Sequence, residues 1–166
     1  MNRSRGTWNN IWVISDSHLR SGENLPAYFI RRLSREDLVF HLGDFTSIDI
    51  VQYLENVASL AGVSGNCDNR DIKDIFPSRK IIELDGFTIG MIHGSGSAAK
   101  TVDAAKREFE NKVDIVLFGH THLPCSFRSG RTLFINPGSL SQGRGRGRGF
   151  GSLHLDRKPW VELHEI

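Results

Sequence analysis

The first regular segment of the chain reads Ile11-Trp12-Val13-Ile14, and Ser15-Asp16-Ser17-His18 follows it directly. The short apolar run predicts a buried β-strand, and the polar residues mark the point where that strand ends. Two similar runs, at residues 38–44 and 60–66, also pass from apolar residues into a polar turn that contains glycine. The chain therefore begins with three predicted strands that each end in a polar cluster.

Helical patterns separate these three strands. A first helix is predicted over about residues 24–33, where Asn24 can cap the helix and Pro26 suits its first turn. Thr46 or Ser47 can cap a second helix before the third strand. The resulting β-α-β-α-β order predicts parallel strands connected by right-handed crossovers.

The second half of the chain has a different pattern. Asp85-Gly86 separates two apolar runs and predicts a β-hairpin. Val102, Ala105 and Phe109 are spaced as on one face of a helix that spans about residues 97–111. Further strands are predicted at residues 114–118, 132–135, 151–155 and 160–163, and the short turns between them favour antiparallel pairing. Together the two halves predict a mixed α/β domain with two sheets.

Composition excludes several classes of protein. The 166 residues suit one domain, residues 1–166, and 39% hydrophobic with 24% charged residues is ordinary for a soluble globular chain. The net charge of +2 does not make the chain a polycation. No apolar run approaches the ~18 residues that would cross a bilayer, and the N-terminal apolar run is too short for a signal peptide. We therefore expect a cytoplasmic protein with no membrane partner and with Cys67 and Cys125 reduced.

Residues that commonly bind metals follow each predicted strand that ends in a polar cluster. Ligands of parallel α/β sheets gather outside the carboxyl ends of the strands, so these side chains should converge. Residues at i and i+2 of an extended chain point the same way, which predicts that each Asp-x-His or His-x-His pair holds one ion. Glycine before Asp44, Asn66 and His120 should allow a sharp turn at each strand end. The candidate ligands are Asp16, His18, Asp44, Asn66, His93, His120 and His122.

This donor set contains carboxylate, amide and imidazole groups but no thiolate. It suits Mn²⁺, Fe, Zn²⁺, Co²⁺ or Ni²⁺ better than Ca²⁺ or a structural zinc. Seven groups are too many for one tetrahedral ion and fit two ions that share a carboxylate. Each motif alone has an ordinary structural explanation: Asp-x-His is often a capped turn, and His93 could be a core histidine. His41 is expected to pack behind the site instead of binding metal.

The order of the motifs resembles that of calcineurin-like metallophosphoesterases, and in particular of small one-domain bacterial and archaeal phosphodiesterases. The resemblance covers about residues 11–141 and includes the segment Asn136-Pro137-Gly138-Ser139. It implies a four-layer α-β-β-α sandwich of two mixed β-sheets flanked by helices. The motifs that carry it are Asp16-x-His18, Gly43-Asp44, Gly65-Asn66-x-Asp68, His93-Gly94 and Gly119-His120-x-His122.

The resemblance also implies a role for each candidate residue. One ion would be held by Asp16, His18 and His122, the other by Asn66, His93 and His120, and Asp44 would bridge them. Asn66, Asp68 and His93 are the implied catalytic residues, with Asn66 facing the phosphate and Asp68 orienting a histidine. The implied reaction is hydrolysis of a phosphate ester, most often a diester, by in-line attack of a hydroxide that bridges two divalent ions. Mn²⁺ is the expected metal, with Ni²⁺, Zn²⁺, Fe, Co²⁺ and Mg²⁺ as alternatives.

Two departures from the family pattern concern the substrate. Cys67 stands where many relatives have a histidine, which can protonate a leaving oxygen better than a thiol can. Cys67 therefore indicates activity on diesters or good leaving groups, unless it merely packs beneath the site. Arg144 begins an arginine-glycine run and could bind substrate phosphate, track a nucleic acid, or lie in a solvated loop.

Two other functions are considered beside the phosphodiesterase. Some relatives use this fold as a protein-interaction scaffold, but they lose metal ligands, and none of the expected ligands is missing from this sequence. An RNA-processing nuclease would use the arginine-glycine run to bind RNA. The family resemblance also allows a homodimer or homotetramer.

Overall fold

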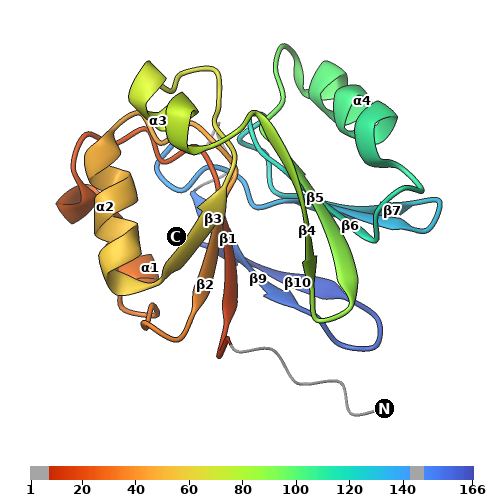
Figure 1. Ribbon diagram of the computed structural model, residues 1–166, viewed down its shortest axis with the longest axis horizontal. Helices are drawn as coiled ribbons and strands as arrows, with labels where there is room; N and C mark the ends of the chain where they lie inside the picture. The colour runs from red at the N-terminus through yellow and green to blue at the C-terminus, as the bar shows by residue number, and fades with distance from the viewer. Residues whose placement is uncertain (1–7, 143–147) are drawn as a thin grey trace.

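The computed structural model describes residues 8–142 and 148–166, so the expected substrate contact of Arg144 lies outside the described residues. Ten strands form two five-stranded sheets. The first sheet has the order β10-β9-β1-β2-β3 and the second has the order β4-β5-β6-β8-β7. Figure 1 shows the two sheets facing each other, with α1 and α2 outside the first and α4 outside the second. This is the expected four-layer α/β architecture.

The first sheet confirms the prediction of parallel strands. β1 pairs in parallel with β2, and β2 pairs in parallel with β3. β9 joins the other side of β1 in the antiparallel direction and carries β10 at the edge. The strands are β1 (Ile11–Ile14), β2 (Leu38–His41), β3 (Ser59–Gly62), β9 (Gly149–His154) and β10 (Trp160–Glu165).

The second sheet is mixed. β5, β6 and β8 are parallel, and the edge strands β4 and β7 are antiparallel to their neighbours. Asp85 and Gly86 connect β4 to β5 with φ angles of 51° and 82°, the left-handed conformations of a tight hairpin turn. The antiparallel pairing predicted for β8 is only partly confirmed, because β8 is antiparallel to β7 but parallel to β6. β7 itself was not predicted from the sequence. The strands are β4 (Arg79–Leu84), β5 (Phe87–Ile92), β6 (Ile115–Phe118), β7 (Cys125–Ser129) and β8 (Thr132–Asn136).

The helices differ from prediction mainly near the first crossover. The helix expected over residues 24–33 is a 3-10 turn, η1, followed by a single α-helical turn, α1, because Leu25 adopts an extended ψ of 142° before Pro26. Ser47 caps α2 as expected, and α4 lies within its predicted range. α3, which Asn69 caps, was not predicted. The elements are η1 (Gly22–Asn24), α1 (Ala27–Ile30), α2 (Ile48–Val57), α3 (Arg70–Ile75) and α4 (Ala98–Phe109).

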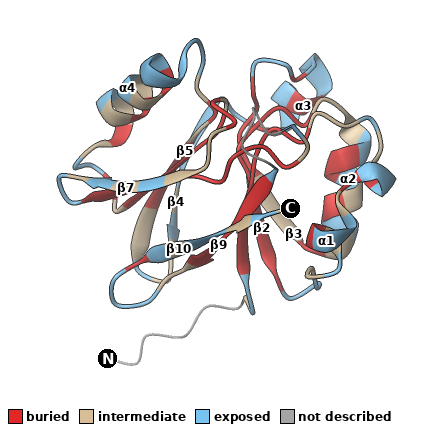
Figure 2. Cartoon of the chain, turned by 180° about the vertical axis from the view of Figure 1, so that it is seen from behind, coloured by how far each residue is buried: buried red, intermediate tan, exposed pale blue. Residues whose placement is uncertain are grey.

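Apolar strands with two buried faces hold the layers together. In β1, Trp12 and Ile14 pack toward the helices α1 and α2, whereas Ile11 and Val13 pack toward the second sheet. A third apolar cluster lies between the second sheet and α4, where Phe109 meets β6 and β8. Figure 2 shows the same division, with buried central strands and helices that expose their outer faces. In the described part of the chain, no helix combines the length and apolarity needed to cross a membrane.

This packing brings the carboxyl ends of strands from both sheets to one end of the molecule. The backbone of Asp16 donates a hydrogen bond to Gly43 O, which joins the ends of β1 and β2. Gly119 donates to His93 O, which joins the ends of β6 and β5. The candidate ligands therefore follow strands of two sheets that meet, not of one sheet.

Candidate metal centre

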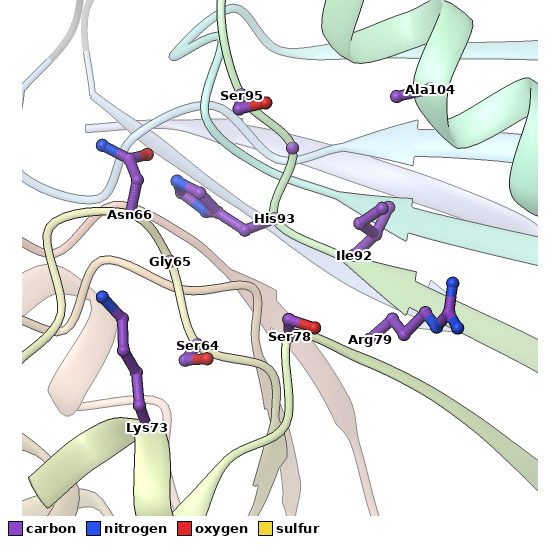
Figure 3. Close-up of a pocket in the computed structure, with 11 residues that line it drawn as sticks. Ser64, Gly65, Asn66, Lys73, Ser78, Arg79, Ile92, His93, Ser95 and Ala104 are labelled. Carbon is purple, nitrogen blue, oxygen red and sulfur yellow. The ribbon is translucent and has the colours of Figure 1, made fainter. Parts of the chain in front are cut away.

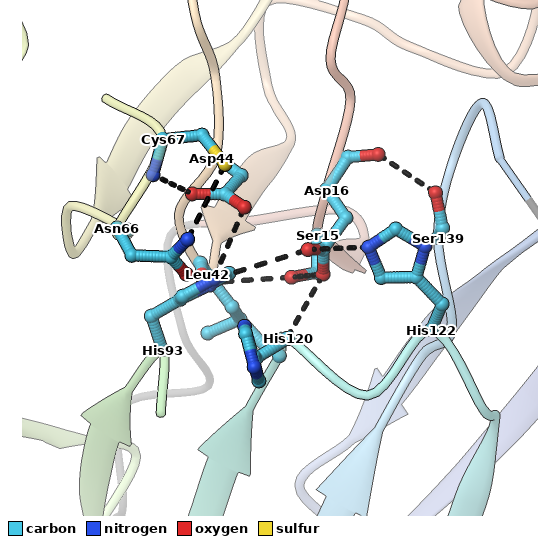
Figure 4. Close-up of polar contacts among 12 residues, drawn as sticks. Ser15, Asp16, Leu42, Asp44, Asn66, Cys67, His93, His120, His122 and Ser139 are labelled. Atoms are coloured by element: carbon cyan, nitrogen blue, oxygen red, sulfur yellow. Dashed lines mark hydrogen bonds and ion pairs between the residues drawn. The ribbon is translucent and has the colours of Figure 1, made fainter. Parts of the chain in front are cut away.

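Six predicted ligands from both sheets meet where the strand ends converge (Figure 4). Asp16 Oδ1 lies 3.0 Å from His122 Nε2, and Asp44 Oδ2 lies 3.3 Å from His93 Nε2. Asp16, Asp44, His93 and His122 are buried, whereas the His18 side chain keeps 15% of its surface exposed. His120 is also only partly buried, so the cluster is mostly buried but can be reached by solvent from both groups.

The aspartates and histidines form two groups. The first contains Asp16, His18 and His122, and the second contains Asp44, His93 and His120. Within each group the possible ligand atoms all lie within 4.8 Å of one another. These are the sets that the family resemblance implied, apart from Asn66. The spacing argument that assigned His120 and His122 to one ion is wrong, because the two imidazoles enter different groups.

The backbone explains why the spacing argument failed. Asp16, His18, Asp44, His120 and His122 all have positive φ angles, between 47° and 65°. An i and i+2 pair points the same way only on an extended chain, and these residues are left-handed. Non-glycine residues in that region cost about 1–3 kcal/mol each and persist where the surrounding structure holds them. Five residues with a strained, left-handed backbone therefore lie at the cluster.

Glycines near the cluster serve two purposes. Gly43 makes the expected sharp turn, with φ of 95°. Gly65 has no such turn, but a Cβ there would lie 2.1 Å from Asp44 Oδ1. A Cβ on Gly119 would likewise lie 2.1 Å from Ser15 Oγ. At these two positions glycine is needed for close approach of the loops.

Asp44 lies between the two groups. Its Oδ2 atom is 3.5 Å from His18 Nε2 of the first group and 3.3 Å from His93 Nε2 of the second. Its other oxygen accepts a hydrogen bond of 2.8 Å from the Cys67 backbone. One oxygen is thus fixed by the protein, and the other faces both sets of imidazoles, as a bridging carboxylate requires.

Three histidine rings are oriented by backbone carbonyls. His93 Nδ1 donates to Leu42 O at 2.6 Å, and His122 Nδ1 donates to Gln142 O at 2.9 Å. His120 Nε2 donates to Gly96 O at 2.8 Å. A carbonyl only accepts, so each of these ring nitrogens carries the proton, and in the neutral ring the other nitrogen offers a lone pair. This arrangement is usual for histidines that bind metals.

Within residues 8–142 and 148–166, several buried polar atoms at the cluster lack a hydrogen-bond partner. They include Asp16 Oδ1, His18 Nε2 and His93 Nε2. An unpaired buried polar atom costs about 1–3 kcal/mol. All three face the space between the two groups, where a divalent cation would satisfy them. The residues present therefore fit a metal centre.

Charge in the cluster is balanced between carboxylates and imidazoles. Burial alone would raise the pKa of Asp16, but His122, His18 and His93 outweigh it and hold the pKa well below its usual range. The nearby Asp16 carboxylate raises the pKa of His18, and for His93 the two carboxylates outweigh burial and raise the pKa as well. Divalent ions would replace the protons of these imidazoles, because metal ligands must be deprotonated.

Asn66 and Cys67 lie at the open side of the second group. Both are exposed, and Asn66 Nδ2 lies 3.3 Å from Cys67 Sγ. Figure 4 shows the Asn66 side chain beside His93 and Asp44, where its oxygen could complete the second ligand set. The alternative that Cys67 packs beneath the site is wrong. Partial burial and the nearby Asp44 carboxylate raise the pKa of the Cys67 thiol, so the group stays protonated at neutral pH.

Asp68 contacts backbone amides and not a histidine. Its carboxylate accepts hydrogen bonds from Gly65 N at 2.7 Å, Thr46 N at 2.8 Å and Asp44 N at 3.0 Å. The expectation that Asp68 orients a histidine is therefore wrong. The side chain ties the loop after β3 to the loop after β2 and so fixes the backbone of Asp44.

His41 is placed as expected, behind the site. The ring is fully buried, stacks on Phe45 at 3.6 Å between centroids, and has Nε2 at 2.9 Å from Ser17 Oγ. Burial lowers the pKa of His41 to about 3, so the ring is neutral in the folded protein.

Sequence reasoning missed the residues that brace Asp16. Ser15 Oγ donates to its carboxylate, and Ser139 Oγ donates to its carbonyl at 2.8 Å. Asn136 Nδ2 donates to Gly119 O at 2.9 Å and so holds the loop that carries His120. The segment Asn136-Pro137-Gly138-Ser139 was noticed in the sequence, but nothing there indicated which loops it would join.

Known proteins with a similar sequence or structure include several phosphoesterases. The family model described as "Calcineurin-like phosphoesterase superfamily domain" matches residues 10–158. A probable metallophosphoesterase of Methanocaldococcus jannaschii is 36% identical over 94% of this chain and 81% of its own length. A phosphodiesterase of the same organism is 26% identical over 92% of this chain and 97% of its own. A crystal structure of a predicted phosphoesterase from Streptococcus pneumoniae has a TM-score of 0.73 at 29% identity, and the match covers 94% of this chain and 88% of that one.

The fold, the two Asp/His groups and these similarities define a metal-binding phosphoesterase of the hydrolase class. Within that class, the chain belongs to the calcineurin-like phosphoesterase superfamily.

Proposed function

We propose that the protein is a phosphodiesterase that uses two divalent metal ions, with Mn²⁺ as the expected metal. The observation that carries this proposal is the pair of Asp/His groups on either side of Asp44, with unpaired lone pairs turned toward each other. A scaffold would not need these atoms, and burying them without partners would only destabilise it.

The ligands divide as the geometry suggests. Asp16, His18 and His122 would hold one ion, His93 and His120 with the Asn66 oxygen would hold the other, and Asp44 would contact both. When bound, two such ions make water acidic enough to supply hydroxide near neutral pH and neutralise charge on the phosphate.

The protein itself positions the reacting groups. The backbone carbonyls behind His93, His120 and His122 fix which ring nitrogen is free, so the imidazoles need no rearrangement before they bind. The exposed Asn66 amide lies at the edge of the second group, where it can also donate a hydrogen bond to a phosphate oxygen.

Cys67 favours diesters and good leaving groups. It lies at the open edge, within 4.8 Å of ligand atoms of Asp44 and His18. A thiol with a raised pKa is a poor proton donor to an alkoxide leaving group compared with an imidazole near its pKa. Replacement of Cys67 by histidine should raise turnover of p-nitrophenyl phosphate relative to bis-p-nitrophenyl phosphate. An unchanged ratio would remove Cys67 from this role.

A metal titration coupled to hydrolysis tests the proposed function. The metal-free protein should be inactive on bis-p-nitrophenyl phosphate, gain activity with Mn²⁺ up to two ions per chain, and lose it on chelation. The alternative metals are compared in the same assay. A chain that binds two ions but hydrolyses no ester would instead favour the scaffold.

The remaining expectations are part of the same proposal. They are a single domain over residues 1–166, a cytoplasmic location, and assembly into a dimer or tetramer. The RNA-processing alternative predicts RNA binding that weakens steeply with salt and depends on the run that begins at Arg144.

A further inference from the structure

A cleft of about 650 Å³ opens directly beside the second group of metal ligands. Asn66 and His93 line it, and Figure 3 shows Ile92 and Ala104, which belongs to α4, on the side of His93 away from Asn66. Its opposite wall comes from α3 and from the start of β4. A molecule bound at the metal centre can therefore extend into the cleft without leaving the protein surface.

The size of the cleft exceeds what a phosphate group needs. Pockets of about 300–1,000 Å³ hold organic ligands of drug or nucleotide size. Ser64, Ser78 and Ser95 place hydroxyl groups along the cleft, and Ile92 and Ala104 add an apolar surface. This combination suits the organic group of an ester more than a free phosphate.

The charge of the cleft is positive. Its lining includes Lys73 and Arg79 but no aspartate or glutamate. Arg79 is already paired, because its guanidinium lies 2.9 Å from Glu108 Oε1. Lys73 forms no ion pair within residues 8–142 and 148–166, and Figure 3 shows its ammonium rising from α3 toward Gly65 and Asn66. Among the described residues, Lys73 is thus an exposed cation of the cleft lining without an ion-pair partner, on the side of Gly65 and Asn66.

We propose that this cleft binds the alcohol part of the ester and that Lys73 selects substrates that carry a second anionic group there. The inference rests on the proposed function and deepens it, because it names the substrate class: phosphodiesters with a further phosphate on one of their alcohols. Lys73 is a specificity-determining residue for this group. In this role Lys73 would bind the second anionic group, whereas the metal centre would bind the reacting phosphate.

Two chromogenic esters that differ by one phosphate test this specificity. Both are p-nitrophenyl esters of thymidine 5′-phosphate, one with a free 3′-hydroxyl and one with a 3′-phosphate. The Mn²⁺-loaded protein should prefer the 3′-phosphorylated ester in kcat/KM by about fivefold, the upper range for a partly exposed ion pair. The preference should shrink as salt increases, because the pair is solvent-accessible.

Substitution of Lys73 tests whether this residue causes the preference for the 3′-phosphorylated ester. Lys73→Ala should abolish the preference and Lys73→Glu should reverse it, each measured as the ratio of kcat/KM for the two thymidine esters. Lys80→Ala is the matched control, since Lys80 is an exposed lysine of β4 outside the cleft, and it should keep the full preference. The proposal is overturned if the unmodified protein shows no preference, or if Lys73→Ala slows both thymidine esters equally.

A binding measurement separates this proposal from the proposed function. By calorimetry, the Mn²⁺-loaded protein should bind thymidine 3′,5′-bisphosphate about fivefold more tightly than thymidine 5′-monophosphate, and Lys73→Ala should remove the difference. If no ester is hydrolysed but this difference appears, the phosphodiesterase proposal fails and the cleft assignment stands. If esters are hydrolysed and both nucleotides bind equally, the cleft assignment fails alone.

Discussion

Asp37 and Asp16 are both fully buried and flank the same pair of parallel strands, yet their surroundings differ completely. Asp37 lies before β2, at the end of the molecule away from the metal centre. Its Oδ1 accepts hydrogen bonds from the backbone and side chain of Asn10, at 3.0 and 2.9 Å. Its Oδ2 accepts from Trp12 Nε1 and Ser34 N, both at 3.0 Å. Each oxygen of Asp37 therefore has two donors.

Asp16, at the opposite end of the strand pair, is only half satisfied. Its Oδ2 accepts from Ser15 Oγ and from the His120 backbone, whereas its Oδ1 has no hydrogen-bond partner. Ring nitrogens of His18, His93 and His122 lie 3.0–3.9 Å from that free oxygen. The carboxylate of Asp37 thus has hydrogen-bond donors at both oxygens, whereas the carboxylate of Asp16 has one oxygen left that could bind an ion. Asp37 should therefore support stability, and Asp16 should support metal binding.

The largest expected effect is that of Asp16→Asn on metal binding. The amide keeps the shape of the side chain but removes the charge that an ion requires. Substitution of a residue that only orients a metal ligand lowers metal affinity about 10–100-fold. Loss of a ligand itself should therefore weaken Mn²⁺ binding by at least about 100-fold. Calorimetric titration and hydrolysis of bis-p-nitrophenyl phosphate measure the loss. Mn²⁺ binding within a few-fold of the unmodified protein would remove Asp16 from the centre.

Asp37→Ala should have the converse effect. It leaves the buried Trp12 Nε1 without an acceptor and removes the partly buried bonds from the backbone amides of Asn10 and Ser34. The free energy of unfolding should therefore fall by about 1–3 kcal/mol. Urea unfolding of the metal-free protein gives this value, and Mn²⁺ affinity of the folded variant should stay within about threefold. If Asp37→Ala weakens metal binding as much as Asp16→Asn does, the division between the two ends fails.

Asp68→Asn tests a residue that stands between these two types. Its carboxylate accepts hydrogen bonds from three backbone amides, and like Asp37 it therefore has a structural contact at both oxygens, but it fixes the loop that carries Asp44. An amide would turn an NH₂ group toward at least one of those N–H donors. We expect Mn²⁺ affinity to fall about tenfold, with a smaller loss of hydrolysis rate once the metal is saturating. A rate that stays low at saturating Mn²⁺ would show that Asp68 acts on more than ligand position.

A buried imidazole outside the metal centre, His41, makes the free energy of unfolding depend on pH. Its pKa is lowered to about 3, so the unfolded chain takes up a proton below about pH 6.5 that the folded protein does not. The His41 contribution to stability is therefore present above pH 6.5 and is lost as pH falls, by up to about 1.4 kcal/mol per pH unit.

Unfolding of the metal-free protein and of His41→Gln between pH 7 and pH 4 isolates that contribution. The unmodified protein should lose stability relative to the variant as pH falls. His18 and His93 have raised pKa values and act in the opposite direction, since their contribution is present below pH 6.5 and is lost as pH rises. Both proteins share that contribution, so it cancels in the difference. Parallel stability curves would mean that His41 is charged or exposed in the folded protein.

Much of the fold could be predicted from the sequence because its strands carry strong local signals. Apolar runs and the Asp85-Gly86 turn predicted nearly all strands and the two sheets. β7 was not predicted because Cys125–Ser129 is short and contains only two apolar residues and no β-branched residue, which gives a weak signal for a strand. α1 was overestimated because the apolar spacing of residues 25–33 extends on both sides of the single turn, Ala27–Ile30, that the structure forms.

The residues of the site could be predicted from the sequence, but their arrangement in space could not. The ordered motifs indicated the aspartates and histidines that the structure brings together. Which histidine joins which group depends on left-handed backbone at His120 and His122, and that conformation arises only when loops from both sheets pack. The contacts of Asp68 were unpredictable for the same reason, because their partners lie 22–24 residues away at Thr46 and Asp44.

The bond from the His120 backbone to Asp16, across 104 residues, has a consequence for how the protein matures. During synthesis the ribosome releases Asp16 and His18 long before His120 and His122 exist, so neither ligand set is complete on a growing chain. If these residues bind metal as proposed, ions can be acquired only after both sheets have formed and docked. The divalent metals accessible to the newly finished protein at that moment, and not those present during translation, then determine which element it carries.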